Sequence, residues 1–174
     1  MEVIMRLSTK GRYAVMAMAD LAAHEGGMRP VSLAEIAKRQ EISLSYLEQL
    51  FAKLRRGGLV KSVRGPGGGY RLSRPADDVR VADIILAVDK PITATRCKQD
   101  SPKGCIGGTS RCVTHDLWEE LGRHIHVFLA AVSLADVVEK RVLGRAGSVA
   151  ADEAHADVDM DGKSKSGDAR AAAA

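Results

Sequence analysis

The chain has 174 residues, enough for one domain with its own core or for a small domain joined to an assembly element. No apolar run approaches the roughly 20 residues that cross a bilayer, and the N-terminus is too short and too charged for a signal peptide, so we expect a cytoplasmic protein without a membrane partner. Residues 1–74 carry 13 Lys and Arg against 6 Asp and Glu, whereas residues 75–174 carry 13 against 16. If a recognisable DNA-binding motif accompanies these basic residues, they favour nucleic acid as a partner. Without such a motif, they would indicate only a solvated surface.

The first predicted helix begins after a short N-terminal extension, residues 1–4. Ser8 or Thr9 can cap this helix, and Gly26 and Gly27 end it. Its apolar residues recur at helical spacing, which is typical of a scaffold helix packed on a core; they are Tyr13, Met16, Ala17 and Leu21.

The next two predicted helices are joined by a tight turn. A capping box of Ser32 and Glu35 starts the first of them, which runs to about Gln40. The second begins near Ser43 or Ser45 and has one apolar stripe, made of Leu47, Leu50, Phe51 and Leu54. Such a pair forms a helix-turn-helix, in which the second helix enters the major groove of DNA and the first braces it.

The polar face of that second helix supplies the candidate DNA-contacting residues. Those expected to meet base edges are Ser43, Ser45, Tyr46, Glu48 and Gln49. Glu48 has an alternative role, because it can instead complete a capping box with Ser45. The residues expected to neutralise phosphates at the far end of the helix are Lys53, Arg55 and Arg56.

Two short predicted strands, residues 59–64 and 70–73, flank the sequence GPGGG at 65–69. A phosphate-binding P-loop is excluded, because no Lys-Ser or Lys-Thr pair and no helix follow these glycines. The segment therefore predicts a β-hairpin wing, with Arg64 and Arg71 as further DNA contacts. The predicted fold is mainly α with this small wing, a winged helix-turn-helix DNA-binding region over residues 5–90.

After a predicted helix at 81–88, three cysteines and a histidine lie close together in a loop over residues 91–115. They are Cys97, Cys105, Cys112 and His115. The residues between them are polar and rich in glycine, which lets a loop close tightly around a ligand. A disulfide would leave one thiol over, so this set predicts a metal or cluster site.

Two other interpretations of this set stay open. A closed zinc site fits less well, because zinc motifs commonly use ligand pairs two to four residues apart and only the last interval here is that short. A thiol redox enzyme would need a C-x-x-C pair, which the chain lacks, so we do not expect an enzyme.

Thr114 can cap a long helix that begins a pair of dimerisation helices over residues 114–142. A capping box of Ser133 and Asp136 is expected to start the second, shorter helix, which runs through Val142. The long helix has more apolar surface than an exposed helix usually carries, in Leu117, Leu121, Ile125, Phe128, Leu129 and Val132. A second copy of the chain would cover it, and a homodimer is also what a palindromic operator requires. A monomer in which this face covers the winged region is the alternative. Residues 143–174 are poor in large apolar residues and are expected to be a disordered tail.

Four features in this order resemble the bacterial iron–sulfur cluster regulators, a family of winged-helix transcription factors. The features are MRLSTKGRYAV at 5–15, ISLSYLEQLF at 42–51, VRGPGGGYRL at 63–72 and the Cys97, Cys105, Cys112 and His115 set. The resemblance covers about residues 5–142.

The resemblance implies a homodimer that binds a palindromic operator in double-stranded DNA and holds a 2Fe–2S cluster through these four residues. It also implies that the iron–sulfur assembly machinery donates the cluster and that the protein chiefly represses the genes for cluster assembly. Alternatives of the same fold are a DNA-binding protein with structural zinc and a nitric-oxide or redox sensor. Intervals of seven and six residues between the cysteines are slightly longer than is usual in that family, which bears on cluster type and lability.

Overall fold

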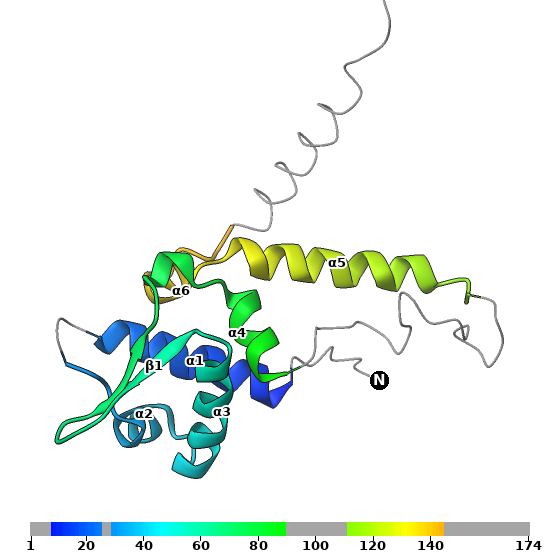
Figure 1. The fold of residues 1–174 in the computed structure, drawn as a ribbon. Coiled ribbons are helices and arrows are strands. Elements are labelled where there is room, and N and C mark those ends of the chain that lie inside the picture. Colours follow the sequence, from blue (N-terminus) through cyan, green and yellow to red (C-terminus); the bar gives the residue numbers. More distant parts are fainter. Residues whose placement is uncertain (1–7, 26–28, 90–110, 145–174) are drawn as a thin grey trace, which may run out of the picture. The chain divides into compact units, whose positions relative to one another are not determined.

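The computed structural model describes residues 8–25, 29–89 and 111–144. All of them except Gly144 belong to one unit of the chain, residues 1–143. The predicted N-terminal extension, Cys97, Cys105 and nearly all of the predicted tail lie outside the described residues. Along the chain, the elements are α1 (Thr9–His24), α2 (Leu33–Gln40), α3 (Leu44–Arg56), β1 (Val60–Val63), β2 (Gly69–Leu72), the 3-10 helix η1 (Ala76–Asp78), α4 (Val81–Val88), α5 (His115–Ala131) and α6 (Leu134–Val138) (Figure 1).

Side-chain caps define where several of these helices begin. The Ser8 hydroxyl accepts a hydrogen bond from the backbone N–H of Gly11 at the start of α1. At the start of α2, Ser32 and Glu35 form the predicted capping box in both directions. The backbone N–H and hydroxyl of Ser32 both donate to Glu35, and these bonds lower the pKa of the Glu35 carboxyl. Both sequence-predicted helix starts are therefore confirmed.

The turn between α2 and α3 depends on Glu41, which has a left-handed backbone conformation with φ of 53°. This reversal ends α2 and directs the chain into α3, so the two helices form the predicted helix-turn-helix. Ser43 is the N-cap residue of α3, but its side chain makes no capping hydrogen bond. Ser45 lies inside the helix, and the alternative capping box of Ser45 with Glu48 does not form between these two described residues.

The wing is an antiparallel hairpin in which Val60 pairs with Leu72 and Val63 with Gly69. β1 is shorter than predicted, because Leu59 and Arg64 lie outside the paired register, and β2 is shifted by one residue, so that it includes Gly69 and ends before Ser73. Val31, just before α2, adds a bridge to Tyr70 through two backbone hydrogen bonds of 3.0 and 2.8 Å. A side chain at Gly69 would collide with the Val31 carbonyl, so this close approach requires glycine. The wing is thereby attached to the helix-turn-helix.

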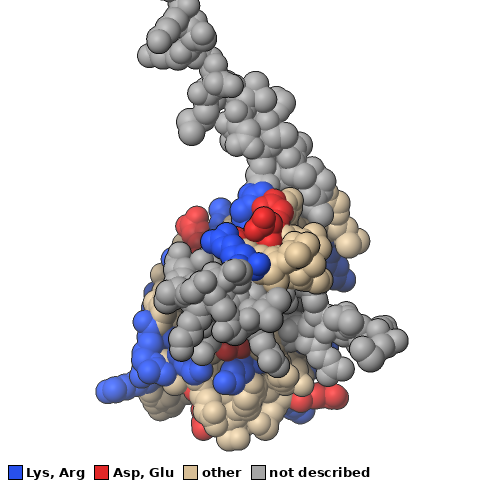
Figure 2. Space-filling model, turned by 90° about the vertical axis from the view of Figure 1, so that its right-hand side faces the viewer, with Lys and Arg blue, Asp and Glu red and all other residues tan. Residues whose placement is uncertain are grey.

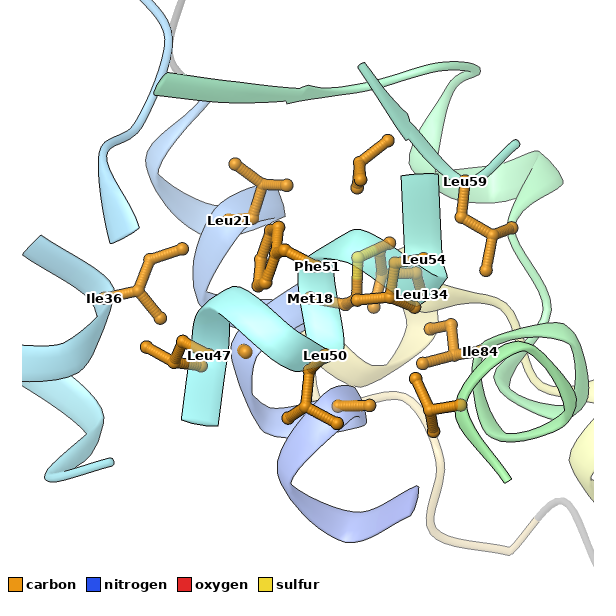
Figure 3. Packing of buried hydrophobic residues seen from close by; sticks show 14 of the residues in the cluster. Met18, Leu21, Ile36, Leu47, Leu50, Phe51, Leu54, Leu59, Ile84 and Leu134 are labelled. Carbon is orange, nitrogen blue, oxygen red and sulfur yellow. The ribbon is translucent and has the colours of Figure 1, made fainter. Parts of the chain in front are cut away.

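The hydrophobic core lies where α1, α3 and α4 meet, and it includes Leu134 from α6. Figure 3 shows Phe51 of α3 within this cluster, with Met18 and Leu21 of α1 close by. The ring of Phe51 also meets that of Tyr70 edge to face, with centroids 4.9 Å apart. The predicted apolar stripe of α3 is therefore the packed face of this helix, and its polar face is left for other contacts.

A charged cluster joins α1 to the end of α2. Asp20, whose side chain is 2% exposed, accepts hydrogen bonds from the Arg39 guanidinium at 2.7 to 3.1 Å and from the Gln40 amide at 2.9 Å. Burial raises the pKa of the Asp20 carboxyl, but these hydrogen bonds and the charge of Arg39 outweigh it, so the pKa is lowered overall. The cluster stabilises the packing of the brace helix against the scaffold helix.

The last described range contains α5 and α6, and α5 packs against α4. Val81, Ile85 and Val132 form a second apolar cluster, against which Phe128 and Leu129 of α5 pack. The predicted capping box of Ser133 and Asp136 is present and starts α6, which stops at Val138, short of the predicted Val142. Helix α4 has the predicted bounds. No helix in the described ranges has both the length and the apolar character needed to cross a membrane.

Candidate nucleic-acid interface and ligand site

The polar face of α3 is accessible along its first two turns. Ser43, Ser45, Glu48 and Gln49 are exposed, whereas Tyr46 is half-buried and meets the ring of Tyr13 edge to face at 5.9 Å. Tyr46, which was predicted to meet a base edge, therefore packs α3 against α1. The other four present short or polar groups of the kind that hydrogen-bond to base edges.

A continuous basic segment runs from the end of α3 through the wing. Residues 53–74 contain seven Lys and Arg and no Asp or Glu. Arg55, Lys61 and Arg64 are exposed and have no ion-pair partner among the residues that the structure describes. On the face drawn in Figure 2, Lys and Arg gather toward the lower left, and other Lys and Arg lie beside acidic residues near the top of the coloured surface. The segment can neutralise several phosphates at once.

Lys61 was missed in the sequence analysis. It is exposed on β1 and pairs in register with Arg71 on β2. Strand alternation could have found it, because residues directly opposite each other in an antiparallel pair lie on the same face of the hairpin. The wing therefore carries three basic residues, Lys61, Arg64 and Arg71, where two were predicted.

Three of the predicted DNA contacts also make contacts within the protein. The Lys53 ammonium donates to the backbone carbonyl of Val88 at 2.8 Å, which links α3 to the end of α4. Arg71 lies 3.9 Å from Glu25, and the same carboxylate accepts a hydrogen bond from the backbone N–H of Leu72. These side chains are only partly exposed, so they help to position α3 and the wing relative to the rest of the fold. Arg56 is exposed and donates to the carbonyl of Ala52 in its own helix.

Two of the four predicted cluster ligands lie within the described residues. Cys112 is half-buried and its thiol is not in a disulfide. The backbone N–H of His115 donates to the carbonyl of Cys112 at 3.0 Å, which forms the turn leading into α5. Thr114 is the N-cap residue as predicted, although its side chain makes no capping hydrogen bond. The His115 side chain is 4% exposed, and it is the only buried residue of α5.

Acidic residues accompany His115 on α5. Glu119 Oε2 lies 3.0 Å from His115 Nε2, and the ligand atoms of His115, Asp116 and Glu119 lie within 4.8 Å of one another. Glu119 lies four residues after His115, a spacing that places both side chains on one face of the helix. The positive end of the α5 dipole favours an anion at His115, and these two carboxylates oppose it.

The next turn of α5 carries an exposed charged group. Arg123 and His124 both bond to Glu120, at 2.6 and 2.8 Å, and their hydrogen bonds lower the pKa of Glu120 to about 2. His124 is therefore engaged with Glu120 on the exposed surface of the helix.

The donor chemistry of Cys112 and His115 fits an iron–sulfur cluster. A thiolate and a neutral imidazole are the protein ligands that such clusters take, and here one precedes and the other opens the same helix. A buried histidine more often belongs to a hydrophobic core than to a metal site. No apolar residue of α5, however, is buried beside His115. The other two predicted ligands, Cys97 and Cys105, lie outside the described residues.

The helix-turn-helix, the hairpin wing and the basic segment together define a DNA-binding protein of the winged-helix class. Residues 7–140 match the model of the Rrf2 family, described as iron-dependent transcriptional regulators. The chain belongs to this family, and it is a DNA-binding transcriptional regulator of the iron–sulfur regulator type rather than an enzyme.

Individual relatives agree with this assignment. The HTH-type transcriptional regulator IscR of Photorhabdus laumondii is 55% identical over 146 residues, which cover 82% of this chain and 85% of that protein. IscR of Cereibacter sphaeroides is 50% identical over 139 residues, with coverage of 79% and 90%. The solved structure of T. potens IscR has a TM-score of 0.61 and 42% identity, and the match covers 78% of this chain and 88% of that one. The resemblance and the fold class predicted from the sequence are thereby confirmed.

Proposed function

We propose that Cys97, Cys105, Cys112 and His115 hold a 2Fe–2S cluster, and that its presence sets which DNA this regulator binds. The observation that carries the proposal is the buried His115 at the first turn of α5, three residues after an unpaired thiol. At this position the His115 imidazole can bind a metal, and α5 can transmit the presence of the metal to the elements against which it packs. The relatives named IscR support the same assignment.

We further propose that α5 forms a twofold dimer. The helix has 17 residues, about 25 Å in length, and Leu117 at its start is 61% exposed. Leu121, Ile125, Phe128 and Leu129 continue the same stripe and are only half-buried. A copy of the same helix would bury this stripe and would set two α3 helices at the spacing of a palindromic operator.

In the proposed complex, the exposed start of α3 reads the bases. Ser43, Ser45, Glu48 and Gln49 meet base edges, while Arg55, Arg56, Lys61 and Arg64 neutralise phosphates. Glu48 accepts only from a donor such as the amino group of cytosine and is repelled by phosphates, so it discriminates among sequences more than it adds affinity. The regulated genes are proposed to encode cluster assembly, with repression when the cluster is bound and the assembly machinery as donor.

Anaerobic purification of the full chain, with visible absorption and analysis of iron, sulfide and zinc, tests the cofactor. Two iron and two sulfide per chain support the proposal, and one zinc per chain without sulfide overturns it. Cys112→Ala should abolish the visible absorption while circular dichroism stays close to that of the wild type, because Cys112 lies outside both apolar clusters. His124→Ala serves as the matched control, since this histidine is exposed on α5.

Footprinting of the cluster-bound and the cluster-free protein on palindromic DNA tests the sensing step. If the cluster-bound form prefers one class of site, DNA of that class must slow cluster loss by the same free energy. Equal affinities of both forms for every site would overturn the claim that the cluster is a signal.

Sedimentation of the wild type and of Leu117→Ser tests the dimer. The variant should dissociate at concentrations where the wild type stays dimeric, because a polar side chain would replace one that the interface buries. Leu86→Ser is the matched control, since Leu86 is also exposed but belongs to α4 and not to the apolar stripe of α5. A wild type that sediments as a monomer would favour the alternative in which α5 only covers the winged region.

A further inference from the structure

Among the residues that the structure describes, the outer edge of β2 is bonded at two points, one to backbone and one to a side chain. Backbone N–H groups alternate in direction along an antiparallel strand, so Tyr70 and Leu72 both point theirs away from β1. The N–H of Tyr70 donates to the Val31 carbonyl at 2.8 Å, and the N–H of Leu72 donates to Glu25 Oε2 at 3.0 Å. The Glu25 carboxylate thus takes the place of a backbone acceptor on a neighbouring strand.

Glu25 is well placed to fix the position of the wing. It is the C-cap residue of α1, and its backbone N–H donates to the carbonyl of the fully buried Leu21 at 2.9 Å. The Glu25 side chain is 19% exposed, so water competes little for its carboxylate. A hydrogen bond to a charged acceptor is stronger than one between neutral groups. The bond therefore joins β2 to the scaffold helix of the winged region.

The position of this carboxylate is unfavourable for α1 itself. The C-terminal end of a helix carries a partial negative charge, which favours a basic residue and opposes an acidic one. The N–H of Leu72 and the guanidinium of Arg71, whose Nε lies 3.9 Å from Glu25 Oε1, offset this cost. The contacts of Glu25 with β2, rather than the needs of its own helix, therefore account for an acidic residue at this position.

A second ion pair near the wing provides a contrast. Arg74, two residues after β2, donates to Asp83 of α4 at 2.7 Å. Their side chains are 41% and 44% exposed, so water and salt screen the pair and it contributes little to the position of the wing. Glu25 differs in its burial, and also because it bonds to the backbone of the strand itself.

Two points of attachment on one strand fix its direction, whereas the bridge at Tyr70 alone would leave the hairpin free to swing. Arg64 directly follows β1, so its position depends on that of the hairpin. We propose that Glu25 is a positioning residue for DNA recognition, which presets the angle of the wing so that Arg64 reaches DNA while α3 lies in the major groove. Such preorganisation favours specific DNA over non-specific DNA, which is bound mainly through charge. This inference rests on the proposed DNA complex and not on the cluster.

Three substitutions of Glu25 separate the hydrogen bond from the charge. Glu25→Gln keeps an acceptor at the same reach but loses the charge, Glu25→Asp keeps the charge but is one methylene shorter, and Glu25→Ala loses both. Asp83→Asn is the matched control, because it removes a carboxylate from the exposed ion pair with Arg74. Arg64→Ala tests whether the wing meets DNA. All variants are compared as the full chain at equal iron content.

Two DNA duplexes serve as probes, one selected by the wild-type protein from a random library and one with the same bases in scrambled order. The ratio of their dissociation constants measures specificity, and hydroxyl-radical footprinting of the selected duplex locates the wing by the protection that Arg64→Ala loses. Glu25→Ala and Glu25→Asp should lower the specificity ratio about 5- to 30-fold, as expected for the loss of one such hydrogen bond, and should weaken the same protection. Glu25→Gln and Asp83→Asn should keep the wild-type ratio, because the loss of a charge changes both affinities alike.

The outcomes separate this inference from the complex on which it rests. If Arg64→Ala keeps every protected position, the wing does not meet DNA, which overturns that contact and this inference with it. If Arg64→Ala loses protection while Glu25→Ala and Glu25→Asp match Asp83→Asn, the complex stands and the role of Glu25 is overturned. An equal fall in the ratio for Glu25→Gln would assign the effect to charge and overturn the hydrogen bond as its cause. If Glu25→Ala does not fold, judged by circular dichroism, Glu25→Asp still decides, since it keeps the charge and changes only the reach.

Discussion

The winged region and α5 are stabilised in different ways. Helices α1, α3 and α4 bury most of their large apolar side chains against one another, with Phe51, Met18 and Leu21 fully enclosed. Helix α5 is twice as long as α4 yet buries only the polar His115. The apolar residues of α5 stay half-buried or, at Leu117, mostly exposed.

This difference in burial indicates which region of the protein can respond to a signal. A region with a complete core keeps its shape whatever it binds, which suits the presentation of α3 and the wing to DNA. A helix without such a core depends on added contacts, and those contacts are what a bound cofactor or a second chain supplies. Stability in the first region and responsiveness in the second can therefore be tested separately.

The largest effect is expected from the core of the winged region. Phe51→Ala should lower the free energy of unfolding by about 3–5 kcal/mol, because it leaves a cavity and removes the ring contact with Tyr70. Urea denaturation followed by circular dichroism measures the loss. Leu86→Ala, at an exposed position of α4, should change the free energy by less than about 0.5 kcal/mol. Equal losses in the two variants would contradict the contrast between core and surface.

The charged cluster between α1 and α2 should give the next effect. Asp20→Asn should cost about 2 kcal/mol at neutral pH, since the buried carboxylate accepts hydrogen bonds from two side chains. The pKa of Asp20 is lowered in the folded protein, so its contribution is present above the ordinary value of 3.8 and is lost as pH falls through the lower folded value. The difference between wild type and variant should therefore shrink at low pH in urea denaturation. Asp77→Asn, on the exposed η1, should change the free energy of unfolding by less than about 0.5 kcal/mol at neutral pH.

Helix caps give a smaller effect, and the chain offers a matched pair. Ser32→Ala should lower stability by about 1 kcal/mol, because the hydroxyl bonds to the backbone of Glu35. Ser43→Ala should leave stability nearly unchanged, because its side chain makes no capping bond, while weakening binding to specific DNA. Thermal unfolding and DNA titration, run on both variants, measure the two quantities. A stability loss in Ser43→Ala as large as in Ser32→Ala would show that Ser43 caps α3 after all.

The smallest effect is expected on the exposed surface of α5. The pKa of Glu120 is lowered to about 2 by Arg123 and His124, so its ion pairs are present above the ordinary value of 4.5 and are lost as pH falls from there through about 2. An NMR titration of Glu120 should show this low midpoint, which should rise toward the ordinary value in about 1 M salt as the charges are screened. Glu120→Gln should leave DNA binding unchanged. A Glu120 midpoint that does not change with salt would contradict the exposed position that the structure gives to Glu120, Arg123 and His124.

Local signals in the sequence predicted much of the fold. The capping boxes at Ser32 and Ser133, the apolar stripe of α3 and the bounds of α4 all follow from patterns within a few residues. The fold class followed because these elements come in a recognised order. At the ligand site, the position of His115 at the start of a helix was predictable for the same reason.

Contacts between distant residues were not predictable in this way. Asp20 meets Arg39 across 19 residues and Lys53 meets Val88 across 35, and no local pattern marks either pair. The bridge of Val31 to Tyr70 likewise shows only when the wing has folded back on the helix-turn-helix. Neighbours four residues apart on a helix, such as His115 and Glu119, are the exception, since their spacing alone places them together.

The bond from Lys53 to Val88 also affects the entropy of DNA binding. A lysine side chain that is fixed only when it reaches a phosphate loses about 1.5–2 kcal/mol of rotamer freedom at that moment. Lys53 is already held against the end of α4, and its ammonium has two further N–H groups to offer. Much of the ordering cost is therefore met during folding, so a phosphate contact made by Lys53 costs less conformational entropy than one made by Arg55, which has no ion-pair partner in the described part of the chain.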